Sequence, residues 1–123
     1  MIGIEDCLSE AMSIPGALGA ILVDHTSGMA VAEKGMPDPA RSAAGLSEAF
    51  RATIDGVAVS SPEGSFRVED LIITTDTSYH LIRPMEMMFD GPLLVCLRLD
   101  RERANLALAR RRLLTITDQL VAS

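Results

Sequence analysis

The stretch that decides the fold runs from Ala17 to Glu33 and reads Ala-Leu-Gly-Ala-Ile-Leu-Val-Asp-His-Thr-Ser-Gly-Met-Ala-Val-Ala-Glu. Its first part, residues 17–23, is apolar on both faces of an extended chain, which is typical of a strand covered on both sides. Residues 24–28 combine short polar side chains with a glycine, as hairpin loops do. Residues 29–34 then alternate and end in two charged side chains, as an edge strand would. The stretch predicts a β-hairpin whose first strand is central in a sheet.

The composition is that of a small domain with an aliphatic core. The 123 residues suffice for one domain, residues 1–123, that buries about two-thirds of its unfolded surface. Apolar residues make up 48% of the chain but aromatic residues only 3%, which argues against a large aromatic-lined ligand cavity. The net charge of −6, without a basic stripe, argues against nucleic acid as a partner.

Neither a secretion signal nor a membrane span is predicted. The N-terminus lacks a basic and apolar signal sequence, and no apolar run approaches the roughly 18 residues that a membrane span needs. Cys7 and Cys96 are isolated cysteines in apolar surroundings, so we expect buried, reduced thiols rather than a disulfide or a zinc site. These features together predict a cytoplasmic protein.

Apolar side chains at helical spacing predict three helices outside the hairpin. The first ends at Pro15-Gly16. The second is long, because Asp38-Pro39 reads as an N-cap followed by proline at the first helical position, and its pattern lasts to about Ala58. The third is predicted to begin after Asp100 as its N-cap. The three apolar stripes are Ile4, Leu8, Ala11 and Met12; Ala43, Leu46, Phe50, Ile54 and Val57; and Leu106, Ala109, Leu113, Ile116 and Leu120.

Three further strands are predicted between the second and third helices. The first runs from Phe66 to Thr75, and a turn at residues 76–78 follows it. The return strand runs from Tyr79 to Met85, and we expect Pro84 to end it. Residues 93–97 are apolar on both faces, which makes them the second candidate for a central strand.

Candidate chemistry is scarce in this sequence. It contains no phosphate-binding glycine loop, no dinucleotide fingerprint and no zinc-protease motif, and no serine stands in a nucleophile elbow. We interpret His25 as a solvated turn histidine rather than a metal ligand or acid–base group, and His80 likewise has no companion ligand. Arg110 to Arg112 are interpreted as a solvated surface. We therefore expect no catalytic, cofactor or metal site, and no enzyme.

The sequence resembles the Roadblock/LC7 family in three segments. These are Pro15 to Asp24, then Gly28, and finally Ala104 to Arg110, in an order and spacing that extend over nearly the whole chain. The resemblance implies a profilin-like α/β (α+β) sandwich of order αββαβββα. Its five-stranded antiparallel sheet has helices on both faces and the strand order second, first, fifth, fourth, third. Similar proteins lack catalytic residues of their own and act as dimeric regulators or scaffolds of small Ras-like GTPases, or as dynein light chains. Nothing in this sequence supplies a dynein context, so the bacterial relatives that accompany a small GTPase fit better.

The leading hypothesis is therefore a non-catalytic homodimer that binds a small Ras-like GTPase. An apolar strand at the sheet edge needs a cover, and small side chains around Phe50, including Gly45, permit close approach; contact with the sheet of the same chain is an equal alternative for this helix face. The expected dimer interface comprises Ala43, Leu46, Phe50, Ile54, Val57, Leu71 and Ile73. The resemblance places the GTPase on the opposite helix surface, at Arg41, Glu48, Arg51 and Asp55.

A second hypothesis belongs to another class of protein. Profilin-like sheets resemble those of ligand-sensing domains, so a small-molecule sensor module is the alternative function. The low aromatic content and the small side chains of the long helix argue against it.

Overall fold

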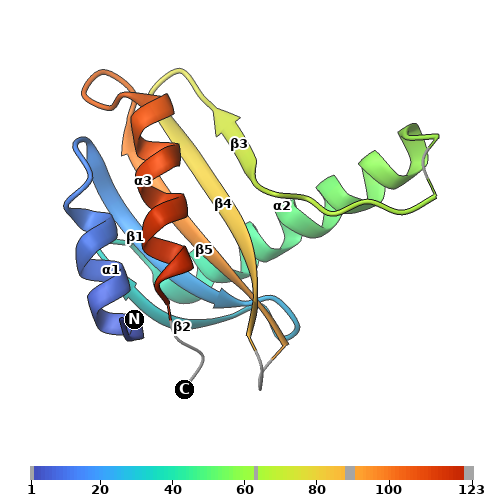
Figure 1. Cartoon of the computed structure of the whole chain (residues 1–123), viewed down its shortest axis with the longest axis horizontal. Helices are drawn as coiled ribbons and strands as arrows, with labels where there is room; N and C mark the ends of the chain where they lie inside the picture. Colours follow the sequence, from blue (N-terminus) through green and yellow to red (C-terminus); the bar gives the residue numbers. More distant parts are fainter. Residues whose placement is uncertain (1, 63, 88–90, 121–123) are drawn as a thin grey trace.

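The computed structural model describes residues 2–62, 64–87 and 91–120. Along the described chain the elements follow the expected order of helix, two strands, helix, three strands and helix (Figure 1). They are α1 (Ile4–Met12), β1 (Ala17–Asp24), β2 (Met29–Lys34), α2 (Pro39–Ser60), β3 (Leu71–Thr74), β4 (Ser78–Met87), β5 (Gly91–Asp100) and α3 (Leu106–Asp118).

The five strands form one antiparallel sheet with the order β2-β1-β5-β4-β3. The two strands that are apolar on both faces, β1 and β5, are therefore internal, as the sequence predicts. β2 is an edge strand and pairs only with β1 among the described strands. The expected hairpin, central strands and strand order are confirmed.

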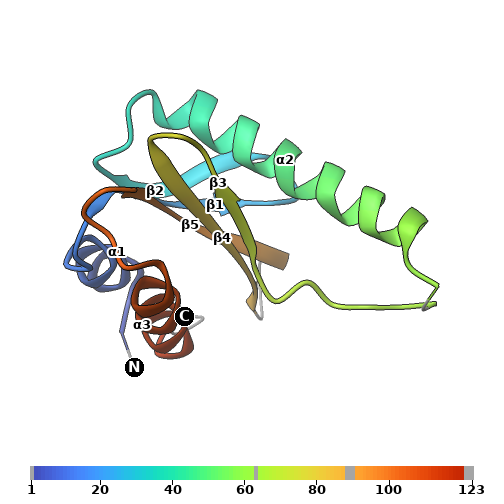
Figure 2. The same ribbon diagram turned by 90° about the horizontal axis from the view of Figure 1, so that it is seen from above.

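Helices cover both faces of the sheet (Figure 2). α1 and α3 lie on one face, where their buried side chains pack with alternate residues of β1, β4 and β5. α2 lies on the other face, which carries the remaining alternate residues of these strands. The α2-side core consists of Ile21, Val23, Ala43, Phe50, Ile82, Leu94 and Cys96, all at most 3% exposed. The two cores explain how strands with a period of two residues are apolar throughout.

α2 begins as expected and continues two residues beyond the expected end. The side chain of Asp38, whose φ is 47°, accepts a hydrogen bond from the backbone N–H of Arg41 at 3.5 Å, and Pro39 occupies the first helical position. The helix packs on the sheet only in its first part. From residue 55 to residue 60 every side chain is exposed, and this end of the helix extends past the edge of the sheet (Figures 1 and 2).

β3 is shorter than the sequence predicts. The expected strand begins at Phe66, but pairing with β4 begins only at Leu71, opposite Ile82, and ends at Thr74. Two residues beyond Ile82 on β4 stands Pro84, which has no N–H to offer to a strand beside it. The chain from residue 64 to residue 70 therefore approaches the sheet without joining it.

Two further expectations are wrong in detail. Pro84 does not end β4, which continues to Met87 and pairs Pro84 with Leu94; proline is tolerated because β4 is an edge strand at this level, where β3 is absent. Asp100 is not the N-cap of the last helix. Its side chain accepts from the backbone of Glu102 in a turn, whereas Asn105 caps α3 by accepting from the backbone of Leu108 at 3.0 Å.

The two cysteines are free thiols on opposite sides of the sheet. Cys7 belongs to the core beneath α1 and α3, and Cys96 to the core beneath α2. Burial raises the pKa of both thiols, that of Cys96 to about 12, so both are protonated and unreactive at neutral pH. No helix in the described ranges has both the length and the apolar character to cross a membrane.

Candidate interaction surface

The outward surface of α2 carries the four residues for which sequence analysis predicts partner binding. Arg41, Glu48, Arg51 and Asp55 all have exposed side chains, and their spacing of seven, three and four residues places them in one line along the helix. We call this line the α2 outer stripe. Two loose ion pairs accompany it, Arg41 with Asp38 at 4.0 Å and Arg51 with Glu48 at 3.8 Å. Such exposed pairs hold little energy, so these side chains are free to re-pair with a partner.

The inward surface of α2 is occupied mainly by the fold itself. Ala43 and Phe50, two of the expected interface residues, are 0% and 3% exposed within the single chain. Leu46 and Ile54 are half-buried against the same α2-side core. The first part of the apolar stripe of α2 therefore packs on the sheet of the same chain, which is the alternative that the sequence left open. The assignment of these residues to a dimer interface stays a prediction.

The end of α2 offers apolar surface that the fold leaves uncovered. Val57 is 37% exposed and Val59 is 89% exposed. Phe66, 37% exposed, lies in the segment that returns from the helix towards β3 (Figure 1). Sequence analysis did not select Val59, because this residue falls outside the apolar stripe of α2. It did not select Phe66 either, because it placed this residue in a strand. We call residues 55–60 the projecting end of α2.

β3 supplies a second uncovered feature, the free edge of the sheet. Ile73 stands opposite His80 of β4 and is 36% exposed, whereas Leu71 packs partly against the α2-side core. Both side chains lie on the sheet face that α2 covers, because Leu71 pairs with Ile82 of that core. Of the described strands, only β4 pairs with β3. An edge with exposed apolar side chains is a site where another chain can pair.

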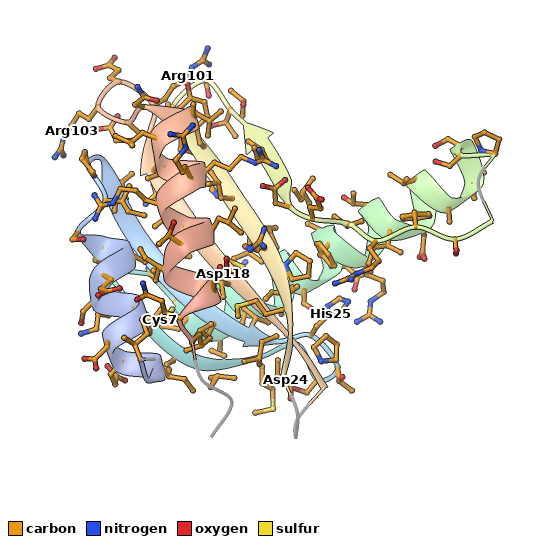
Figure 3. All side chains as sticks on the ribbon, viewed as in Figure 1. Cys7, Asp24, His25, Arg101, Arg103 and Asp118 are labelled. Carbon is orange, nitrogen blue, oxygen red and sulfur yellow. The ribbon has the colours of Figure 1, made fainter. Side chains whose placement is uncertain are left out.

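His25 is not a freely solvated turn residue, contrary to the sequence interpretation. Its Nδ1 atom lies 3.0 Å from Oγ of Ser47 on α2, and its ring meets the ring of Phe50 edge-on at 5.4 Å. Figure 3 shows His25 beside Asp24 on the hairpin loop, next to α2. Burial, followed by the charge of Arg51, lowers the pKa of His25. The residue therefore joins the β1–β2 loop to the packed part of α2.

Arg110 is likewise engaged rather than simply solvated. Its guanidinium grips the carboxylate of Asp70 with two donors, one of them at 3.3 Å, and this hydrogen bond raises the pKa of Arg110. Arg83 donates to the backbone oxygen of Glu69 at 3.2 Å. These contacts hold the chain just before β3 against α3 and β4. Arg112 donates to Ser13 at 3.1 Å.

The polar side chains of the described residues can be compared with the arrangements that metal sites and catalytic triads require. In the ranges that the structure describes, no three His, Cys, Asp or Glu side chains come together as a metal site would require. The two histidines bond to serines, His25 to Ser47 and His80 to Ser78, each at 3.0 Å, and no carboxylate among the described side chains hydrogen-bonds to either ring as in a catalytic triad. What the surface does offer is exposed charge beside exposed apolar side chains.

Neither protein-family models nor curated protein sequences give a match to this chain. Solved structures do. A Roadblock/LC7 domain from Streptomyces avermitilis superposes with a TM-score of 0.70 at 12% identity, covering 95% of this chain and 93% of the other. Gliding protein MglB from Thermus thermophilus gives 0.68 at 20% identity, with 94% and 88% covered. MglB from Myxococcus xanthus gives 0.66 at 17% identity, with 92% and 84% covered.

These likenesses concern the fold, and they cover 92–95% of this chain. They agree with the element order, the strand order and the placement of α2 opposite α1 and α3. At identities of 12–20% they do not transfer individual site residues. The chain has the fold of Roadblock/LC7 domains.

Proposed function

We propose that this chain is a non-catalytic regulator or scaffold that acts as a homodimer and binds a small Ras-like GTPase. The observation that carries the proposal is the projecting end of α2, residues 55–60, which extends past the sheet edge with no side chain buried. A helix end of this kind gains nothing from its own domain, which suits a surface built for another protein. The Roadblock/LC7 fold adds the class of partner through the resemblance described above.

Self-association is supported by the position of the uncovered apolar residues. Ile73 lies on β3, the edge strand that pairs only with β4 among the described strands, and the projecting end of α2, where Val57 and Val59 are exposed, extends past the edge of the sheet (Figure 2). A second copy that pairs at β3 would cover this edge and bring a second α2 alongside. Removing such apolar residues from water favours association. Another similar structure is described as MglB with a tetrameric arrangement.

GTPase binding is assigned to the α2 outer stripe, Arg41, Glu48, Arg51 and Asp55. This line stays exposed when the inward side of α2 packs on the sheet, and charged side chains at such a surface set the orientation and rate of encounter. Arg51 lies in the middle of a regular helix and pairs with Glu48. Because Arg51 is not on a loop that could enter a nucleotide site, we assign it to docking rather than to an arginine finger.

Titration calorimetry tests the GTPase proposal with the full chain and the small Ras-like GTPase encoded nearest its gene, in GDP and GTP-analogue forms. We expect Arg51→Glu to raise the Kd about tenfold, which is ~1.4 kcal/mol. Arg111→Glu is the matched control, because Arg111 is exposed on α3 at the opposite face of the sheet. An unchanged Kd for Arg51→Glu in both nucleotide states would remove the α2 outer stripe as the docking site.

A further inference from the structure

A hollow of about 390 Å³ lies between the first turns of α2 and the sheet. Its floor includes His80 of β4 and Arg98 of β5, which stand opposite each other in the sheet. Both face α2, since each is two residues from a member of the α2-side core, Ile82 or Cys96. Arg41, the first residue of the α2 outer stripe, also lines the hollow, with its side chain 87% exposed.

The charge of this hollow is opposite to that of the chain. The whole chain has a net charge of −6, yet none of the described residues that line the hollow carries a carboxylate, and two of them are arginines. Arg98 takes part in none of the ion pairs formed within the described ranges. Burial and the charge of Arg98 lower the pKa of His80. Arg41 pairs only loosely with the exposed carboxylate of Asp38, at 4.0 Å, so a bound anion would supply the charge partner that Arg98 lacks among the described residues.

Gly45 forms part of the helix wall of the hollow. It lies inside α2, where glycine costs roughly 1 kcal/mol relative to alanine, and sequence analysis anticipates a packing reason for it. A Cβ atom at Gly45 would meet nothing within 4 Å, so no contact within the chain requires a glycine. Gly45 does line the hollow. A glycine there adds no side chain to this wall of the hollow.

The remaining walls of the hollow include apolar side chains, which indicates that a ligand would have an apolar part. Met36 and Leu46 are apolar and half-buried, so a bound molecule would lay apolar atoms against them while its charged group meets the arginines. Guanidinium groups bind carboxylate and phosphate through two parallel hydrogen bonds. We propose that this hollow binds a small organic anion, with one carboxylate or phosphate group on a short apolar body, between Arg41 and Arg98.

The proposal is tested by nuclear magnetic resonance on the full ¹⁵N-labelled chain. Sodium butyrate and inorganic phosphate are the two probes, each titrated at constant ionic strength against sodium chloride. We expect saturable shifts of the Ser42 and Gly45 amide signals with both probes. Butyrate should also shift the signals of Leu46. Absence of a saturable shift up to about 50 mM, well above a Kd of ~1 mM, would overturn the proposal.

Variants separate the hollow from general charge screening. Arg98→Gln should raise the Kd of both probes about tenfold or more, because a charge-assisted contact is lost. Arg41→Gln, at a side chain that is 87% exposed and so no risk to folding, should act in the same direction. Arg111→Gln on the opposite face should leave both Kd values unchanged. Equal effects of Arg98→Gln and Arg111→Gln would contradict the site.

Discussion

The two parts of α2 differ in what holds them in a helix. Up to Ile54 the helix packs on the sheet through Ala43, Ser47 and Phe50, and the His25 ring adds a contact from the hairpin loop. Beyond Ile54 no side chain is buried. Short isolated helices are marginal in water, because most helix stability in proteins comes from packing. The comparison teaches that packing within the chain stabilises only the first part of this continuous helix, and the dimer that we propose would supply packing for the second part.

Phe50→Ala should have the largest effect on this comparison. The side chain is 3% exposed in the α2-side core, and its truncation leaves a cavity, so we expect a loss of about 3–5 kcal/mol in the free energy of unfolding. Urea denaturation at low protein concentration measures it. Val59→Ala, at a residue 89% exposed, should lose almost nothing. Equal losses would mean that the projecting end is packed within the chain.

Acid should weaken the packed part of α2 through its histidine contact. The pKa of folded His25 is lowered from 6.5, so the unfolded chain binds protons more readily and stability is lost as the pH falls below about 6.5. His80, whose pKa is also lowered, contributes in the same direction. Thermal unfolding followed between pH 7.5 and 5.5 should therefore show a falling midpoint. The midpoint should fall less in His25→Gln than in the parent chain. An identical fall would mean that His80, and not His25, is the histidine that causes it.

Gly45 and Gly56, the two exposed glycines of α2, allow the packed part and the projecting end of the helix to be compared with the same substitution. A Cβ atom at Gly45 or Gly56 meets nothing within 4 Å, so alanine is tolerated at both. Gly45→Ala should stabilise the chain by about 0.5–1 kcal/mol, because that part of the helix is anchored. Gly56→Ala should raise the free energy of unfolding of the monomer by less than Gly45→Ala does, because helix formation around Gly56 is not coupled to packing of the core. Denaturation midpoints of the two variants at equal concentration decide this.

The smallest effect on folding is expected from Val59→Asp. A charge on a fully exposed side chain should leave the unfolding midpoint of the monomer within about 0.5 kcal/mol of the parent. The same change should abolish the dimer that we propose, because it places a charge in an apolar contact. Sedimentation at micromolar concentration should show twice the 13.2 kDa chain mass for the parent and one chain mass for the variant. A parent that sediments as a monomer contradicts the dimer.

Periodicity within a segment was sufficient to predict most of the fold. The alternation in residues 17–23 and the three- and four-residue steps of α2 are local patterns, and the structure follows them. The short β3 was not predictable in this way, because its start depends on Pro84, which lies across the sheet rather than along the chain. The N-cap of α3 was not predicted correctly either. Asp100 and Asn105 are both good cap residues, and only the end of β5 decides between them.

The candidate surfaces were predictable to different degrees. The α2 outer stripe is exposed as expected, because a helix with one buried side must leave the opposite side to solvent. The contact of His25 with Ser47 joins residues 22 apart, and the hollow brings together Met36, His80 and Arg98 from three parts of the chain. No motif marks such sites. The one local sequence feature at the hollow was Gly45, a glycine in the interior of a predicted helix.

The projecting end of α2 also has a calorimetric consequence. Because residues 55–60 bury nothing within the chain, a partner that covers Val57 and Val59 both hides apolar surface and orders the backbone beneath it. Association of this kind carries a negative heat capacity change and an unfavourable ordering entropy. The enthalpy of association should therefore become steadily more favourable on heating while the affinity changes little. Two protomers would meet through a helix end that has no packing of its own within the chain.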